Sequence, residues 1–550
     1  MYPKIPLAQS IIEICKQKEV QHIVISPGSR NAPLTIGFTN NPYFKCYSIA
    51  DERCAAFFAL GMAQQMQKPV ALVCTSGSAL LNYYPAVAEA FYSQIPLVVI
   101  SADRPQSKID IGDGQTIRQE NVFANHSLFN ANLSDETSVV NDNLIQEAIS
   151  ISISKKGPVH INAPFEEPLY ETVPEMTYVP LIVENITIQK TFDFQLEFLE
   201  KWHKATKKLI VVGELFPNSI EQKYLDFLGN DPSVVVLTEK TSNIHHQSFI
   251  SQIDTLITPF SEDDFENFQP EILFTFGGMV ISKRIKSFLR KYQPENHWHV
   301  DVLRAYDTYG VLSHHFETSI NTFFSHFLIG NRVESNYKTS IASIWKERVK
   351  AHKIYSKTVP FSDFKVFDFL SQNLPKNIQL QVSNSSPIRY IQLFDLNPSI
   401  EVFCNRGTSG IDGSTSTAIG AAVTSEKPTF FITGDISFLY DSNALWNNYI
   451  PKNFKIIILN NGGGGIFRIL PGHQETETFN TFFETSHQLD AVHLAKMYEL
   501  NYFEATDEAS LEASYSSFIN EQSGPSVLEV FTPEKYNNSI LLDFFKSLKN

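Results

Sequence analysis

The most constraining stretch of this sequence runs from residue 404 to residue 467, where two apolar segments each end in a short polar turn. The first segment ends in Gly434-Asp435, and the second ends in Asn460-Asn461 followed by four consecutive glycines. Short apolar runs, separated by enough chain for a helical crossover, indicate neighbouring strands of a parallel sheet. The carboxyl ends of such strands meet at one edge, where α/β proteins place their ligand sites.

The side-chain oxygens of Asp435 and Asn461 can therefore approach one cation at that edge. A carboxylate and an amide form a weakly charged oxygen set that suits Mg²⁺, which completes its octahedron with phosphate and water oxygens. Mn²⁺ accepts similar ligands, so the choice of metal stays open. Glycines 462–465 leave backbone groups free to contact a diphosphate. Residues 409–414 open a small-residue helix whose first amides favour a phosphate group.

The length of 550 residues and the order of segments predict three consecutive α/β domains with mainly parallel sheets. The predicted domains span residues 1–180, 190–335 and 355–550, with a proline-containing linker near 165–190 and a charged helix near 335–360. Strands are expected at residues 22–26, 44–49, 69–74, 97–101 and 159–162, then at 209–212, 234–237, 272–276 and 298–302, and finally at 378–382, 399–403, 429–433, 455–459 and 527–531.

Composition excludes several classes of function. A net charge of −15 argues against a nucleic-acid footprint. No apolar run approaches the roughly 20 residues that span a bilayer, and the first residues lack the features of a signal peptide. The five cysteines are scattered, without metal-binding or disulfide spacing, which indicates thiols in a reducing compartment. We therefore expect a cytoplasmic protein that binds neither nucleic acid nor membrane.

The pattern from Gly434 to Asn461 resembles the magnesium-diphosphate signature of the thiamine diphosphate enzymes. In that family the aspartate, the second asparagine and a nearby carbonyl hold Mg²⁺, so the resemblance implies Asp435, Asn461 and the carbonyl of Gly463 as metal ligands. Ile436 stands where many members have a third glycine, which leaves these ligands unaffected. The resemblance also implies an aminopyrimidine-binding (PYR) domain, a central domain and a diphosphate-binding (PP) domain, in that order.

Glu52 has the setting of the family's catalytic glutamate, because it follows a predicted strand and precedes an Ala-rich helix. In the family this glutamate hydrogen-bonds N1′ of the aminopyrimidine and promotes removal of the cofactor's C2 proton. The glutamate and the diphosphate site come from different subunits there. The resemblance therefore implies a homodimer or homotetramer with active sites at the subunit interface.

Longer strings narrow the resemblance, among them SPGSRNAPL, DERCAAFFALG, SADRP and NRGTSGIDG. They are similar to the branch of the family that acts in menaquinone biosynthesis, densely in the first and third domains and thinly in the second. That branch decarboxylates 2-oxoglutarate and adds the succinyl carbanion to isochorismate in a Stetter-like 1,4-addition. Both substrates are dianions, and bidentate arginine is the natural partner of a carboxylate.

The resemblance implies two sets of site residues, drawn mainly from loops. The substrate pocket is expected to include Ser29, Arg30, Arg104, Gln115, Lys283, Arg284, Ser385, Arg389 and Arg406, with Asn384 as a neighbour. Cofactor contacts are expected from Glu52, Ser409, Gly410, Ile411, Gly434, Asp435, Ile436, Ser437, Asn461, Gly463, Gly464, Ile466 and Phe467. Within the second set, Ile411 matches the bulky apolar residue that props the cofactor into its bent shape.

Other functions are weighed against this one. A decarboxylase or carboligase of the acetolactate-synthase or 2-oxoacid-decarboxylase type handles small, singly charged acids, and some of these enzymes also bind FAD. Such an enzyme has less use for four loop arginines, here Arg30, Arg104, Arg389 and Arg406. An inactive binding protein with this fold would be expected to lack Glu52. A nucleotide-binding oxidoreductase would need a GxGxxG motif after a strand, which the sequence lacks.

Overall fold

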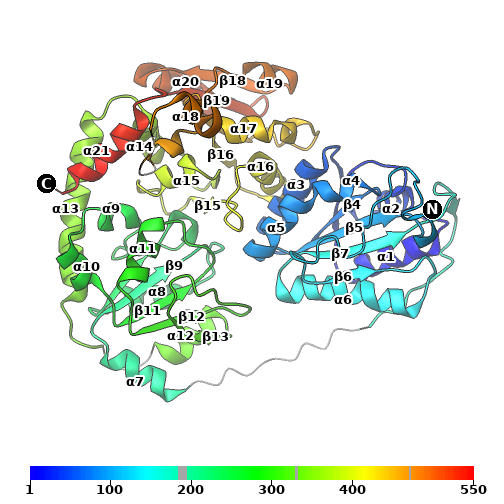
Figure 1. Ribbon diagram of the computed structural model, residues 1–550, viewed down its shortest axis with the longest axis horizontal. Coiled ribbons are helices and arrows are strands. Elements are labelled where there is room, and N and C mark those ends of the chain that lie inside the picture. The colour runs from blue at the N-terminus through cyan, green and yellow to red at the C-terminus, as the bar shows by residue number, and fades with distance from the viewer. Residues whose placement is uncertain (184–194, 329–331, 470–471, 473, 550) are drawn as a thin grey trace.

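The computed structural model describes residues 1–183, 195–328, 332–469, 472 and 474–549. Within these residues the chain forms three α/β units in sequence, each built around a parallel sheet (Figure 1). The first unit, blue to cyan, lies on one side of the molecule, and the green second unit and the yellow-to-red third unit lie on the other. The long helix α13 (Tyr337–Thr358) runs along the outer edge and joins the second unit to the third.

The first unit has a six-stranded sheet in the order β3-β2-β4-β5-β7-β6. Its central strands β4 and β5 are buried along their whole length, as expected for a sheet covered by helices on both faces. The strands are β2 (His22–Ile25), β3 (Lys45–Ser48), β4 (Val70–Cys74), β5 (Leu97–Asp103), β6 (Asn130–Asn132) and β7 (Val159–Pro164), and β1 (Tyr2–Pro3) pairs with β8 (Thr172–Val173) in a separate ribbon. The helices are α1 (Pro6–Gln17), α2 (Ala32–Asn40), α3 (Glu52–Met66), α4 (Ser78–Asn82), α5 (Tyr84–Ser93), η1 (Gln106–Lys108) and α6 (Val139–Lys155).

The second unit has a five-stranded sheet in the order β10-β9-β11-β12-β13 and an aromatic core that includes Phe274, Trp298 and Phe323. Its strands are β9 (Lys208–Val212), β10 (Val234–Leu237), β11 (Ile272–Phe276), β12 (Asn296–Val300) and β13 (Leu312–Phe316). Its helices are α7 (Leu196–Lys204), α8 (Gln222–Gly229), η2 (Lys240–Ser242), α9 (Ile253–Ile257), α10 (Glu262–Phe268), α11 (Lys283–Lys291) and α12 (Ile320–Phe327).

The third unit repeats the strand arrangement of the first, with the order β15-β14-β16-β17-β19-β18. In both sheets the strands, numbered along the unit, lie in the order second, first, third, fourth, sixth, fifth. The strands are β14 (Gln379–Val382), β15 (Glu401–Phe403), β16 (Thr429–Gly434), β17 (Lys455–Asn460), β18 (Asn501–Ala505) and β19 (Ser526–Phe531). The helices are α14 (Asp363–Asn373), α15 (Ser386–Ile391), α16 (Ser414–Thr424), α17 (Asp435–Tyr440), η3 (Ser442–Leu445), η4 (Gly465–Ile469), α18 (Glu477–Phe479), η5 (Asn480–Glu484), α19 (Val492–Met497), α20 (Glu508–Asn520) and α21 (Asn537–Ser547).

The first and third units are joined by the crossing of α3 and α16, the helices that follow the second strand of each sheet (Figure 1). A Cβ atom on Gly61 of α3 would lie 2.0 Å from the carbonyl oxygen of Thr417, and one on Gly420 of α16 would lie 2.0 Å from that of Phe58. Each helix therefore presents bare backbone to the other. One apolar core continues through this crossing from the first unit into the third.

The α/β fold with parallel sheets that the sequence predicts is confirmed, and so are all fourteen expected strands, within one or two residues at most ends. The strand expected at 298–302 begins earlier, at Asn296, because its polar first residues pair with β11. The predictions omitted β1, β6, β8, β13 and β18, whose short or polar sequences lack an apolar run. The expected domain start at residue 190 lies outside the described residues. No helix in the described parts of the chain is both long and apolar enough to cross a membrane.

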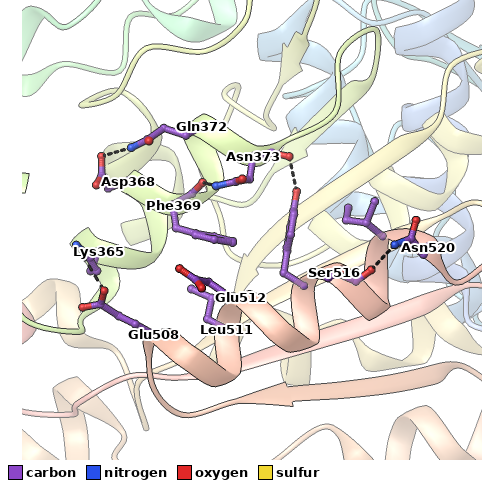
Figure 2. A pocket seen from close by; sticks show the side chains of 12 residues that line it. Lys365, Asp368, Phe369, Gln372, Asn373, Glu508, Leu511, Glu512, Ser516 and Asn520 are labelled. Atoms are coloured by element: carbon purple, nitrogen blue, oxygen red, sulfur yellow. Dashed lines mark hydrogen bonds and ion pairs between the residues drawn. The ribbon is translucent and has the colours of Figure 1, made fainter.

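A surface groove of about 580 Å³ lies between α14 and α20 of the third unit (Figure 2). The ion pair of Lys365 with Glu508, at 3.7 Å, crosses one end of the groove. Also in the lining of the groove, the Tyr515 hydroxyl donates to the carbonyl of Asn373 at 3.0 Å. None of the predicted site residues lines this groove, so it does not belong to the site described below.

Candidate active site

The carboxyl edge of the third sheet holds Asp435, which directly follows β16. Its Oδ2 atom accepts the backbone N–H groups of Gly462 at 2.9 Å and Gly463 at 3.0 Å, and its Oδ1 atom accepts that of Ile436 at 2.7 Å. The turn after β16 is thereby tied to the glycine turn after β17. Asp435 is only 4% exposed, so this carboxylate is held in a fixed orientation.

Asn461 lies beside it, at the end of β17. The side-chain Nδ2 of Asn461 donates to Oδ2 of Asp363 at 2.9 Å, whereas its buried Oδ1 atom has no hydrogen-bond partner among the described residues. A buried acceptor without a donor is costly unless a ligand completes it. The carbonyl of Gly463 accepts the N–H of Gly465 at 3.0 Å and keeps a second lone pair. These oxygens match the donor set that Mg²⁺ prefers.

The glycine turn packs against a segment that the sequence did not single out, residues 484–487. A Cβ atom on Gly463, whose φ is +155°, would lie 2.8 Å from the carbonyl oxygen of Glu484, so only glycine fits there. Glu484 also forms a buried ion pair with Arg468, which fastens the end of the turn. His487 Nε2 lies 3.4 Å from Oδ2 of Asp435, and this carboxylate raises the pKa of the imidazole.

The start of α16 completes this edge. The hydroxyl oxygens of Ser414 and Thr415, in the first turn of this helix, are buried and have no partner among the described residues. Ser437 Oγ donates to the carbonyl of Ile411 at 2.7 Å and links this turn to α17. A helix N-terminus with free hydroxyls provides donors for phosphate oxygens.

Asn384 connects the two proposed substrate loops of the third unit. Its Oδ1 accepts Nη1 of Arg406 at 2.5 Å, and its Nδ2 donates to the carbonyls of Asn405 at 2.6 Å and Gly410 at 2.8 Å. The next residue, Ser385, has a φ of +71°, an unusual conformation for a serine. The buried Nε of Arg406 has no partner among the described residues and remains a free donor.

Arg389 is the second guanidinium of this unit. Burial lowers its pKa, the charge of Arg406 lowers it further, and Asp254 of the second unit opposes both effects. An anion placed between two like charges relieves the repulsion that lowers the pKa of Arg389. Arg389 and Arg406 therefore form a site suited to a carboxylate ligand.

Acidic residues of other units surround Arg406, and sequence reasoning missed them. Glu89, on α5 of the first unit and 1% exposed, accepts the N–H groups of Gly407 at 2.7 Å and Thr408 at 2.6 Å. Burial raises the pKa of Glu214 in the second unit to about 8, with Glu89 adding to the rise and Arg406 opposing it. A glutamate inside the apolar string AVAEA was the available signal, because buried charges need partners.

The second unit reaches this region through the start of α11. Asp254 interacts electrostatically with both Arg284 and Arg389, and the Ser282 hydroxyl donates to this carboxylate. Lys283 and Arg284 are exposed, and the guanidinium of Arg284 lies 4.7 Å from the centre of the Phe545 ring. The structure thus places Arg284 near Arg389, and it leaves Lys283 at the surface without bringing it into the cluster.

The first-unit residues gather at the carboxyl edge of the first sheet. Arg30 donates to the carbonyl of Phe165 at 3.1 Å and to Glu167 at 3.0 Å, so its charge is already paired. The buried Nε of Arg104 has no partner among the described residues. Ser29 is exposed, and the carbonyl of Gln115 accepts Ser76 Oγ at 2.9 Å.

Glu52 is half-buried at the start of α3, and its neighbours are held by the third unit of the same chain. Asp51 Oδ2 accepts Nδ2 of Asn443 at 2.9 Å, and Arg53 donates to the carbonyl of Tyr440 at 2.9 Å. No hydrogen bond or ion pair between described residues connects Glu52 to Asp435 or Asn461. Arg53, the residue after Glu52, contacts the last residue of α17, whereas Asp435 is the first residue of that helix.

The remaining predicted cofactor contacts lie on the same edge of the third sheet, in the turns before α16, after β16 and after β17. They are Ser409, Gly410, Gly434, Gly464, Ile466 and Phe467. Among the described residues, no cluster of three or more His, Cys, Asp or Glu side chains is arranged to hold a metal. The metal site proposed here differs from such clusters, because its ligands are one carboxylate (Asp435), one side-chain amide (Asn461) and one backbone carbonyl (Gly463).

Family models match most of the chain. The thiamine pyrophosphate enzyme N-terminal TPP binding domain matches residues 5–126, the middle domain of thiamine pyrophosphate matches 183–382, and the C-terminal TPP binding domain matches 386–530. Three similar proteins are each described as 2-succinyl-5-enolpyruvyl-6-hydroxy-3-cyclohexene-1-carboxylate synthase. They come from Flavobacterium psychrophilum, Flavobacterium johnsoniae and Christiangramia forsetii, at 66%, 64% and 52% identity, each alignment covering 100% of both chains. The chain belongs to the 2-succinyl-5-enolpyruvyl-6-hydroxy-3-cyclohexene-1-carboxylate synthase family of thiamine diphosphate enzymes.

Proposed function

We propose that this enzyme decarboxylates 2-oxoglutarate and adds the succinyl unit to isochorismate, giving 2-succinyl-5-enolpyruvyl-6-hydroxy-3-cyclohexene-1-carboxylate and CO₂ in menaquinone biosynthesis. The observation that carries the proposal is the full-length identity of 66% to a synthase of that name. The pair formed by Arg389 and Arg406 supports it, because two dianionic substrates need fixed guanidiniums near the cofactor.

The cofactor of this activity is thiamine diphosphate, bound with Mg²⁺ or Mn²⁺. Asp435, Asn461 and the Gly463 carbonyl would hold the metal, and the first turn of α16 with the glycine turn would hold the diphosphate. When bound, the thiazolium of the cofactor acts as an electron sink that permits loss of CO₂ from a 2-oxoacid. Backbone N–H groups orient Asp435, and a side-chain hydrogen bond to Asp363 orients Asn461.

The chain's own residues then have distinct tasks. Glu52 exchanges a proton with the aminopyrimidine nitrogen, as a carboxylate at hydrogen-bond range can. Arg389 and Arg406 hold substrate carboxylates, and Arg104, whose buried Nε has no partner among the described residues, contributes from the first sheet. Ser29, Arg30, Gln115, Arg284 and Ser385 complete the proposed pocket, whereas Lys283 lies at the surface outside this cluster. Positioning two anions beside one carbon lowers the entropic part of the barrier.

The active enzyme is proposed to be a homodimer or homotetramer. The family resemblance supports this, because the catalytic glutamate and the diphosphate site come from different subunits there. No hydrogen bond or ion pair between described residues of one chain connects Glu52 at the start of α3 to Asp435, so a second copy would supply its own Glu52 to the cofactor held at Asp435. The reaction is placed in the cytoplasm, where the five unpaired cysteines would stay reduced.

The test is an assay of purified protein with thiamine diphosphate, Mg²⁺, 2-oxoglutarate and isochorismate, in which the loss of isochorismate is followed. We expect turnover that stops when either cofactor is omitted or when the metal is removed by a chelator. Turnover of pyruvate alone, with flavin absorbance in the purified protein, would instead indicate an enzyme of the acetolactate-synthase type.

A further inference from the structure

Asp363 makes a contact with the proposed metal site that no sequence motif indicates. It occupies the first position of α14, and it is 2% exposed. Its Oδ2 atom accepts Nδ2 of Asn461 at 2.9 Å, across 98 residues of sequence. The carboxylate therefore lies directly behind one of the proposed metal ligands, on the side away from the open Oδ1 atom.

Two further contacts hold Asp363 in place. Its Oδ1 atom accepts the hydroxyl of Thr532 at 2.5 Å, and its backbone N–H donates to Oδ1 of Asn537 at 2.8 Å. Thr532 directly follows β19, so the carboxylate is fastened both to the sheet and to the start of α21. Asp363 thus has little freedom to rotate.

An ionised carboxylate only accepts hydrogen bonds, whereas an amide has one accepting and one donating end. Asp363 can therefore pair only with the Nδ2 end of Asn461, which turns the Oδ1 end outward. That Oδ1 atom is buried and has no partner among the described residues. A cation needs the oxygen end of an asparagine, because the NH₂ group has no lone pair to give.

We propose that Asp363 is a positioning residue that fixes the amide of Asn461 so that its Oδ1 atom coordinates the divalent cation. The inference rests on the metal site proposed above. Residues behind a metal ligand commonly change metal affinity by about 10–100-fold when they are replaced.

The replacement Asp363→Asn removes this constraint. The Thr532 hydroxyl can donate to the oxygen of the new amide or accept from its NH₂ group, so either end of that amide can face residue 461. Where the NH₂ group faces residue 461, Asn461 presents its own oxygen to it and turns its NH₂ end toward the cation. The double variant Asp363→Asn with Asn461→Asp restores an oxygen on the metal side, because a carboxylate at position 461 accepts from position 363 and keeps a second oxygen free.

The experiment is a titration of Mn²⁺ into protein saturated with thiamine diphosphate, with free Mn²⁺ measured by electron paramagnetic resonance. This readout needs no turnover. We expect Asp363→Asn to weaken Mn²⁺ binding at least tenfold and the double variant to restore it to within about threefold of wild type. Asp142→Asn is the matched control, since Asp142 is equally buried and hydrogen-bonded but lies on α6 of the first unit.

The outcomes separate the two levels of the proposal. Wild-type protein that binds no Mn²⁺ would refute the metal site itself. Unchanged binding in folded Asp363→Asn would overturn the role of Asp363, and weak binding in both variants would overturn the orientation argument. If Asp363→Asn does not fold, the double variant is compared with wild type directly, where similar affinity supports the proposal and a tenfold loss overturns it.

Discussion

The first and third units have the same strand order, yet they place different chemistry at the same positions. After the second strand the first sheet presents Glu52, and the third sheet presents Arg406. After the fourth strand the first sheet presents Arg104, and the third sheet presents Asn461. The scaffold is therefore repeated while the loops differ; under the function proposed above, the first sheet would serve proton exchange and the third would hold a cation and phosphate.

The two units also differ in how their arginines are paired. Arg104 and Arg406 each have a buried Nε without a partner among the described residues, but Arg30 in the first unit is bound to Glu167, whereas Arg406 in the third has a repelling neighbour, Arg389. The third sheet is thus the one that places two like charges side by side. The predictions below test this division of tasks, from the largest expected effect to the smallest.

Replacing Glu52 by glutamine should lower kcat by about 10²–10⁴-fold, because a positioned acid–base group contributes about that much. Size-exclusion chromatography should show the same oligomer as wild type. Glu147→Gln, at an exposed position on α6, serves as the control and should retain full activity. Normal turnover by Glu52→Gln would contradict the proposed role of Glu52 in proton exchange.

The crossing of the equivalent helices predicts a loss of stability. Gly61→Ala or Gly420→Ala should lower the free energy of unfolding by about 3 kcal/mol, because the new methyl group meets a backbone carbonyl that cannot move aside. Urea unfolding measures the change. Gly524→Ala, whose nearest neighbour would lie 3.6 Å away, is the matched control. If the urea midpoint of Gly61→Ala equals that of Gly524→Ala, the close backbone contact between α3 and α16 is contradicted.

Replacing Arg389 or Arg406 by alanine should lower kcat/KM by about 10–100-fold, the value of one or two charge-assisted hydrogen bonds. Affinity for thiamine diphosphate, followed by tryptophan fluorescence, should change little. The exposed Arg290→Ala provides the control. If neither arginine variant changes kcat or KM for either substrate, the pocket lies elsewhere.

Glu89→Gln should raise KM about fivefold and change kcat less, because it weakens the hold on the loop of Arg406 by about 1 kcal/mol. A purely structural effect would instead lower the amount of active enzyme and leave KM unchanged. Ser93→Ala removes only the contact of its hydroxyl with Glu89 and should have little effect on KM.

Much of the fold follows from local sequence. Each expected strand is an apolar run bounded by turn residues, and such runs in a buried parallel sheet are nearly uniform along their length. The edge strand β18 was missed because its sequence, NYFEA, mixes polar and apolar residues at a half-exposed edge. The repeat of the strand order was not visible either, since it is preserved in topology and not in residue pattern.

The candidate site was only partly predictable for a different reason. Asp435 and Asn461 directly follow strands, so their proximity could be inferred from the sheet alone. Asp363 and His487 reach the site from a distant helix and a distant loop, and a single sequence carries no signal for such contacts. Glu89 stands out as a charge in an apolar string, but the sequence does not indicate its partners Gly407 and Thr408. Neighbouring residues can also differ in whether they reach the site. Lys283 lies at the surface, whereas Ser282 donates a hydrogen bond to Asp254.

The shared core around α3 and α16 has a consequence for synthesis of the chain. Helix α3 ends at Met66 and its partner begins at Ser414, so about 350 residues separate them. At roughly 5–20 residues per second, a ribosome needs on the order of 20–70 s to supply the second helix. During that time the apolar face of the first unit has no permanent cover. Nascent chains of this enzyme are therefore expected to be substrates for chaperones that bind exposed apolar surface, until α16 emerges.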